Sequence, residues 1–121
     1  MEVWVNPACS KCRTATAHLD EAGVDYTVRR YLDEPPTAEE LTAVLDRLGL
    51  EPWDVARTGE KVAKEIGLAD LPRDPDARER WVAAMVAHPI LIQRPILAAD
   101  DGTTVVGRDP HSLQRAVDAG R

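Results

Sequence analysis

The chain has 121 residues, of which 44% are hydrophobic and 30% are charged, as in an ordinary soluble domain. Its net charge of −6 disfavours a direct nucleic-acid interface and binding to an anionic membrane surface. No stretch has the pattern of a membrane span or an export signal. We therefore expect a cytoplasmic protein that forms one domain over residues 1–121.

The N-terminal residues predict a strand, a turn and a helix in close succession. Val3–Val5 is a short apolar run typical of a buried strand, and Asn6-Pro7 ends it. Apolar residues then recur at helical spacing, at Cys12, Ala15, Leu19 and Ala22. We therefore expect a helix that begins near Ser10.

Two cysteines lie at this predicted turn. Cys9 falls at the positive end of the helix dipole, close to Lys11 and Arg13, and these features favour the reactive thiolate. Cys12 lies one helical turn later on the same face, within disulfide reach of Cys9. A C-x-x-C sequence at such a turn predicts a thioredoxin-like redox site.

Two other roles for these cysteines can be weighed against the redox role. Free cysteine often serves as a small buried hydrophobe, which is the structural alternative for Cys9 and Cys12. A zinc site needs about four ligands, and no second C-x-x-C or spaced histidine pair supplies the remaining ones. We therefore expect no metal and favour thiol chemistry.

The middle of the chain is expected to be helical after a second strand. Residues 24–31 predict a strand parallel to the first, which completes a β-α-β unit. Thr37 and Glu40 have the capping-box pattern, and the helix that they begin is closed by Gly49. Further helical segments are expected up to His88, so residues 37–88 form an all-helical insert.

The C-terminal part predicts a hairpin and a closing helix. Residues 90–98 are expected to form a strand, in which Pro95 implies an edge, a bend or a cis peptide. Asp101-Gly102 indicates a hairpin turn to a strand over 103–106, and Asp109-Pro110 caps a helix that ends near Ala119. This order predicts an α/β thioredoxin-like fold: a four-stranded mixed sheet with the helical insert between its βαβ and ββα halves.

Four stretches spread along the chain resemble one family, the glutaredoxin-coupled arsenate reductases (ArsC-like) and the related Spx regulators. They are Asn6-Pro7-Ala8-Cys9, Tyr31-Leu32-Asp33-Glu34-Pro35-Pro36, Glu65-Ile66-Gly67-Leu68 and His88-Pro89-Ile90-Leu91-Ile92-Gln93-Arg94-Pro95-Ile96. The last stretch is the most specific, whereas C-x-x-C alone would be a weak signal.

The resemblance implies a set of site residues. Cys9 would attack arsenate, the oxyanion would be held by Arg57, Arg94 and Arg108, and Pro95 would be cis beside the nucleophile. Arginine suits this role because its planar set of donors binds oxyanions bidentately and stays charged. A structural salt bridge is the alternative for Arg94, and a solvated surface position is the alternative for Arg57 and Arg108.

The resemblance also implies the electron donor. No cofactor would be bound, and glutathione with glutaredoxin, or another thioredoxin-type thiol, would supply the electrons. Cys12 could instead resolve the reaction by forming a disulfide with Cys9. Because a cysteine at the position of Cys12 is typical of the Spx-like branch, two alternatives remain: a redox-switch regulator that binds RNA polymerase, and a general thiol-disulfide reductase.

Overall fold

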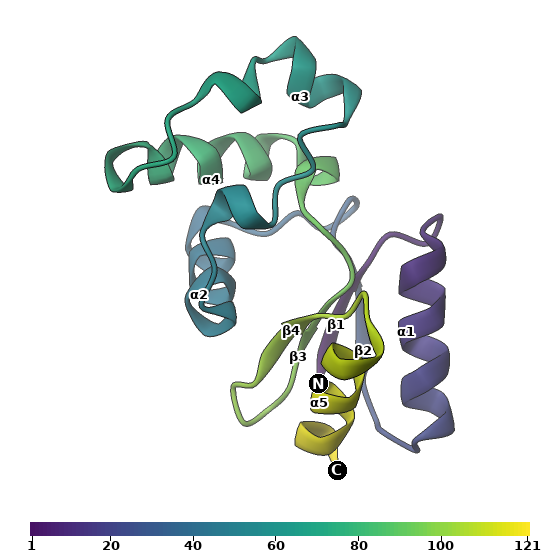
Figure 1. Ribbon diagram of the computed structural model, residues 1–121. Helices are drawn as coiled ribbons and strands as arrows, with labels where there is room; N and C mark the ends of the chain where they lie inside the picture. The colour runs from purple at the N-terminus through teal and green to yellow at the C-terminus, as the bar shows by residue number, and fades with distance from the viewer. The chain divides into compact units, whose positions relative to one another are not determined.

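The computed structural model describes residues 1–121, which fold into two compact units (Figure 1). One unit combines residues 1–34 with residues 94–121, and the other is the continuous segment 35–93. The helical insert expected at about 37–88 falls within the second unit. The assignment of the whole chain to one domain stays a prediction.

The first unit is built on a four-stranded mixed sheet. Its strands, in the order β2-β1-β3-β4 across the sheet, are β2 (Thr27–Arg30), β1 (Glu2–Val5), β3 (Ile96–Ala98) and β4 (Thr104–Val106). β1 and β2 are parallel, whereas β3 is antiparallel to both β1 and β4. The predicted α/β thioredoxin-like sheet, including the parallel β1–β2 pair and the C-terminal hairpin, is confirmed.

Helices α1 (Ser10–Glu21) and α5 (Pro110–Gly120) cover one face of this sheet (Figure 1). Val3 and Leu97 are cross-strand neighbours, and so are Leu97 and Val105. These three side chains form a core with the apolar stripes of the two helices, at Cys12, Ala15, Leu19, Leu113, Ala116 and Val117. The helical spacing of the N-terminal apolar residues therefore predicted the buried face of α1 correctly.

Two predicted strands are shorter in the structure than in the sequence analysis. β2 begins at Thr27 rather than Val24, because the backbone N–H of Val24 still donates to the Leu19 carbonyl at the end of α1. The expected strand over 90–98 is also wrong in its first part. Pro89–Leu91 forms a short 3-10 helix, η4, and β3 begins only after Pro95, which has no N–H to donate to a strand pair.

The second unit contains three α-helices: α2 (Ala38–Leu48), α3 (Lys61–Glu65) and α4 (Arg78–Ala87). The Thr37 hydroxyl accepts from the Glu40 N–H, and the Glu40 carboxylate accepts from the Thr37 N–H, which confirms the predicted capping box. Gly49 ends α2 with φ 68°, a left-handed conformation that glycine adopts at little cost. None of the helices in the structure has the length and hydrophobicity that crossing a membrane requires.

Candidate active site

A tight loop built on Asn6 connects β1 to α1. The Asn6 side-chain Oδ1 accepts from the Ala8 N–H at 3.0 Å, and the Asn6 carbonyl accepts from the Cys9 N–H at 2.9 Å. The Asn6 N–H in turn donates to the Cys12 sulfur at 3.4 Å. Because Asn6 is itself buried, these three bonds fix the path of the chain between the sheet and the two cysteines.

Cys9 is the residue that caps the N-terminus of α1, and its side chain is partly buried. Burial alone would raise the pKa of this thiol, but nearby donor groups outweigh that effect and lower the pKa from 9.0 to about 6. These groups are the backbone N–H of Cys12, the Arg94 guanidinium, the backbone N–H of Lys11 and the Cys12 thiol. Cys9 is therefore a thiolate at neutral pH.

Cys12 has the opposite character. Its side chain is only 1% exposed, and this burial, reinforced by the neighbouring Cys9 charge, raises the pKa of the Cys12 thiol to about 11. Both cysteines are free thiols in the structure. The pair therefore consists of one reactive thiolate and one protonated thiol that hydrogen-bonds to it.

Arg94 belongs to the same unit as Cys9 and is 8% exposed. The peptide bond between Arg94 and Pro95 is cis, as the resemblance implied for Pro95. Arg108 follows β4, and its Nη1 donates to the Arg94 carbonyl at 2.7 Å. The Gly107 N–H also donates to the Pro95 carbonyl, at 2.9 Å. Hydrogen bonds from Gly107 and Arg108, after β4, therefore hold the backbone at Arg94 and Pro95 in place.

Arg57 lies in the helical unit, so its relation to Cys9 stays a prediction. Its Nε donates to a Glu60 carboxylate oxygen at 3.0 Å, and its Nη1 donates to Gln93 Oε1 at 2.7 Å. These residues, together with Gly59 and Lys61, line a cavity of ≈ 410 Å³ within that unit. Arg57 is thus ion-paired with Glu60, whereas the sequence analysis gave a solvated surface position as its alternative role.

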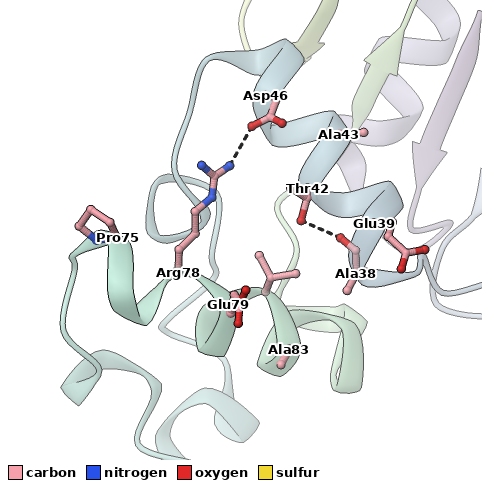
Figure 2. Close-up of a pocket in the computed structure, with 10 residues that line it drawn as sticks. Ala38, Glu39, Thr42, Ala43, Asp46, Pro75, Arg78, Glu79 and Ala83 are labelled. Atoms are coloured by element: carbon pink, nitrogen blue, oxygen red, sulfur yellow. Dashed lines mark hydrogen bonds and ion pairs between the residues drawn. The ribbon is translucent and has the colours of Figure 1, made fainter.

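A cavity of ≈ 760 Å³ lies elsewhere in the helical unit, between α2 and α4 (Figure 2). Three of its polar side chains have partners, because Arg78 binds Asp46 at 3.0 Å and the Thr42 hydroxyl donates to the Ala38 carbonyl at 2.8 Å. Neither cysteine lines it. The structure also contains no group of three or more His, Cys, Asp or Glu side chains that could hold a metal ion. Cys9 stays the predicted site of the reactive chemistry.

The structure adds two residues that the sequence analysis did not assign to the site. Asn6 was interpreted as the end of a strand and as part of a family motif, with no role in the site. Asparagine commonly hydrogen-bonds to the backbone two residues further on, which was the available signal. Gly107 lies so close to Leu97 and Leu113 that a Cβ atom would collide with them. No local pattern predicts this second requirement, because it depends on packing between β3, β4 and α5.

The sheet topology and a thiolate at the first strand-to-helix turn define a thioredoxin-like thiol protein. A sequence model described as the ArsC family matches residues 4–116, and the chain belongs to this family. This membership confirms the ArsC-like resemblance drawn from the sequence motifs, whereas coupling to glutaredoxin stays a prediction.

Individual relatives agree with this membership. The chain is 57% identical over 117 residues to an uncharacterised protein in the glnII region of Streptomyces viridochromogenes, covering 97% of this chain and 98% of the relative. It is 36% identical over 115 residues to an arsenate reductase of Neisseria meningitidis serogroup A, covering 94% and 95%. The solved structure of an arsenate reductase from Vibrio cholerae matches with a TM-score of 0.79 and 34% identity, covering 98% of each chain.

Proposed function

We propose that this protein is a thiol-dependent arsenate reductase in which Cys9 is the nucleophile. The observation that supports it most strongly is the position of Cys9 at the N-cap of α1 in the same unit as the buried Arg94, whose guanidinium helps to lower the pKa of the Cys9 thiol. A thiolate next to a buried arginine can both attack a tetrahedral oxyanion and hold its negative oxygens. Family membership and the arsenate reductases among the relatives support the same choice of substrate.

The proposed reaction begins with attack of the Cys9 thiolate on arsenic. A sulfur–arsenic bond forms, an arsenic–oxygen bond breaks, and the departing oxygen leaves as water after protonation. Arg94 and Arg108 balance the charge on the remaining oxygens, and Arg57 is the third arginine proposed for this role. Because the guanidinium group stays charged at any working pH, the site favours the anionic substrate throughout.

A second thiol then completes the proposed reduction. It attacks the Cys9 sulfur, a disulfide forms, and the electron pair of the sulfur–arsenic bond passes to arsenic. Arsenic(V) thus becomes arsenic(III) and is released as arsenite, while two thiols are oxidised by one electron each. Glutathione, with glutaredoxin to restore the enzyme, is the proposed donor. Cys12 is the internal alternative, because its thiol hydrogen-bonds to the Cys9 sulfur.

A general thiol-disulfide reductase is the second candidate. The hydrogen-bonded pair of a reactive Cys9 thiolate and a protonated Cys12 thiol favours it, because such a pair can exchange with a substrate disulfide. In that case a disulfide would take the place of arsenate, and no step would depend on the arginines binding an oxyanion.

A comparison of two substrates distinguishes the arsenate reductase from the general thiol-disulfide reductase. The reduced protein is given either arsenate, with glutathione and glutaredoxin present, or a small disulfide such as hydroxyethyl disulfide, with glutathione alone. Each rate is compared with the rate of the same mixture without the protein. We expect arsenite to form, and we expect sulfate to inhibit its formation by competing for the arginines. Turnover of the disulfide alone, with no effect of sulfate, would support the second candidate instead.

The Cys12→Ser variant identifies the resolving thiol in the same assay. If glutathione resolves the Cys9 adduct, arsenite formation continues in this variant. If Cys12 resolves it, arsenite formation stops although the Cys9 adduct still forms, and intact-mass spectrometry detects that adduct.

A further inference from the structure

A shallow groove lies between α1 and the edge strand β2, within the unit that contains the cysteines. Its volume is ≈ 240 Å³, and its lining comes from β1 and the loop after it, from α1 and from β2: Val5, Pro7, Cys12, Arg13, Thr16, Val28 and Arg30. None of the arginines proposed to bind the oxyanion lines it. The groove is therefore separate from the arginine set of the proposed substrate site.

The groove exists because the helices leave the edge of the sheet uncovered. Val28 is the cross-strand neighbour of Val3, and the two side chains lie on the same face of the sheet. Val3 is completely buried, whereas Val28 is 51% exposed. An apolar strip at the sheet edge is thus open to a ligand.

Two cations border this apolar strip. Arg13 projects from α1 and Arg30 from β2, and no carboxylate is among the residues that line the groove. Arg13 donates only to the Pro7 carbonyl, at 3.1 Å, and neither arginine forms an ion pair. Two unpaired guanidinium groups in a protein of net charge −6 make a local site for a small molecule that carries carboxylates.

The groove also reaches Cys12, one of the two thiols, whereas Cys9 does not line it. Cys12 forms part of its wall, and the Cys12 thiol hydrogen-bonds to the sulfur of Cys9. A ligand in the groove would therefore contact Cys12, whose neighbour Cys9 carries the sulfur that a second thiol would attack.

We propose that the α1–β2 groove binds an acidic low-molecular-weight thiol, with its carboxylates on Arg13 and Arg30 and its aliphatic part on Val5 and Val28. This inference rests on the proposed function, since the bound thiol would be the one that reduces the Cys9 adduct. It adds the place where the reductant binds and the charge that the reductant must carry. The reaction remains the disulfide-forming step already described, with the same balance of electrons.

A binding experiment tests the groove without any turnover. The Cys9→Ser variant, which cannot form a mixed disulfide at residue 9, is titrated with S-methylglutathione, whose sulfur is capped, and amide chemical shifts are followed. We expect saturable shifts at Thr16, Val28 and Arg30. Replacing Arg30 by Gln should weaken binding by about three- to tenfold, as for the loss of a partly exposed charge pair.

Arg115→Gln is the matched control, because Arg115 is an exposed arginine of α5 in the same unit and does not line the groove. Binding in this variant should equal that of its parent. The absence of saturable shifts, shifts confined to other elements, or equal weakening in Arg30→Gln and Arg115→Gln would each overturn the proposal.

Kinetics separate failure of the groove from failure of the proposed function. We expect Arg30→Gln to raise the KM for glutathione while the KM for arsenate is unchanged, and we expect cationic cysteamine to be a poorer reductant than glutathione. Arsenate turnover with an unchanged glutathione KM in Arg30→Gln would overturn the groove alone. Specific S-methylglutathione binding in a protein that does not reduce arsenate would overturn the reductase and retain the groove as a site for the acidic thiol.

Discussion

At the scale of single residues, the two thiols differ because their surroundings differ. Interactions with backbone N–H groups in the first turn of α1 and with the Arg94 guanidinium stabilise the negative charge of the Cys9 sulfur. Cys12 faces the core that α1 shares with the sheet, where its charge would be poorly solvated. Cys9 and Cys12 are only three residues apart, yet the pKa of one thiol is lowered and that of the other is raised.

The pH dependence of alkylation tests the state of Cys9. With a pKa of about 6, roughly nine-tenths of Cys9 is thiolate at pH 7, and this fraction is lost as the pH falls through 6. The rate of iodoacetamide modification should therefore rise with a midpoint near pH 6, as followed by intact mass. In Arg94→Gln the midpoint should move to higher pH, because one donor to the thiolate is lost. A wild-type midpoint near 9 would contradict the account.

The geometry of Arg94 can be tested while its charge is kept. Lysine cannot offer the paired donors of a guanidinium, so Arg94→Lys should raise the KM for arsenate by about tenfold or more, as for the loss of a charged hydrogen bond. Steady-state kinetics at fixed glutathione measure this change. Unchanged kcat and KM would remove Arg94 from the proposed oxyanion site.

At the scale of elements, the site depends on close packing between the C-terminal hairpin and α5. Gly107 packs against Leu97 of β3 and Leu113 of α5, and its N–H donates to the Pro95 carbonyl. The guanidinium of the next residue, Arg108, donates to the carbonyl of Arg94. A disturbance of this packing would therefore reach the backbone of the arginine that hydrogen-bonds to Cys9.

Gly107→Ala should destabilise the protein. A Cβ at this position would lie 3.1 Å from a Leu113 methyl carbon and closer still to Leu97, so the core must shift. We expect the free energy of unfolding to fall by about 1–3 kcal/mol, as for overpacked cores, measured by urea denaturation. Gly59→Ala is the matched control, because nothing lies within 4 Å of its added Cβ. Equal effects of the two substitutions would show that close packing at Gly107 is unimportant.

Helix α2 and residues 90–98 show which elements could be predicted from the sequence and which could not. Helix α2 was predicted well because its signals are local: Thr37 and Glu40 at one end and Gly49 at the other. Residues 90–98 were predicted less well, because their apolar composition does not distinguish a strand from a short helix. Ile92 in fact pairs with Ala56 in an isolated bridge, a contact between segments that no local pattern indicates.

For the candidate site, the sequence predicted where Cys9 and Pro95 lie in the fold better than it predicted which groups contact them. The placement of Cys9 at a strand-to-helix turn followed from the apolar spacing, and the cis peptide before Pro95 followed from the resemblance. The contact of Arg108 with the Arg94 carbonyl depends on the three-dimensional return of β4 and could not be derived from spacing. The groove beside Arg30 could not be derived from spacing either, because it depends on how α1 packs next to the edge strand β2.

At the scale of the whole molecule, the net charge of −6 opposes the approach of an oxyanion. This repulsion is screened within about 8–10 Å at physiological ionic strength, so contact with individual arginines must decide binding. Specific anion binding should therefore appear as added stability of the folded protein rather than as a general effect of salt.

Thermal unfolding tests this expectation. A ligand at 100 times its Kd stabilises the folded state by about 2.7 kcal/mol, so arsenate or sulfate should raise the Tm by several degrees over chloride of equal ionic strength. The increase should be smaller in Arg94→Lys, in which the paired donors are lost. An identical Tm in sulfate and chloride would argue against an oxyanion site.

The measurement that tests the central claim most directly is arsenite formation from arsenate, with glutathione and glutaredoxin in excess, by the wild-type protein and by Cys9→Ser. The wild-type protein should turn over, and Cys9→Ser should produce no arsenite above the rate without protein, because serine lacks the thiolate that attacks arsenic. Circular dichroism establishes that both proteins are folded. Arsenite formation by Cys9→Ser at a rate near that of the wild type, or no turnover by folded wild-type protein, would contradict the account.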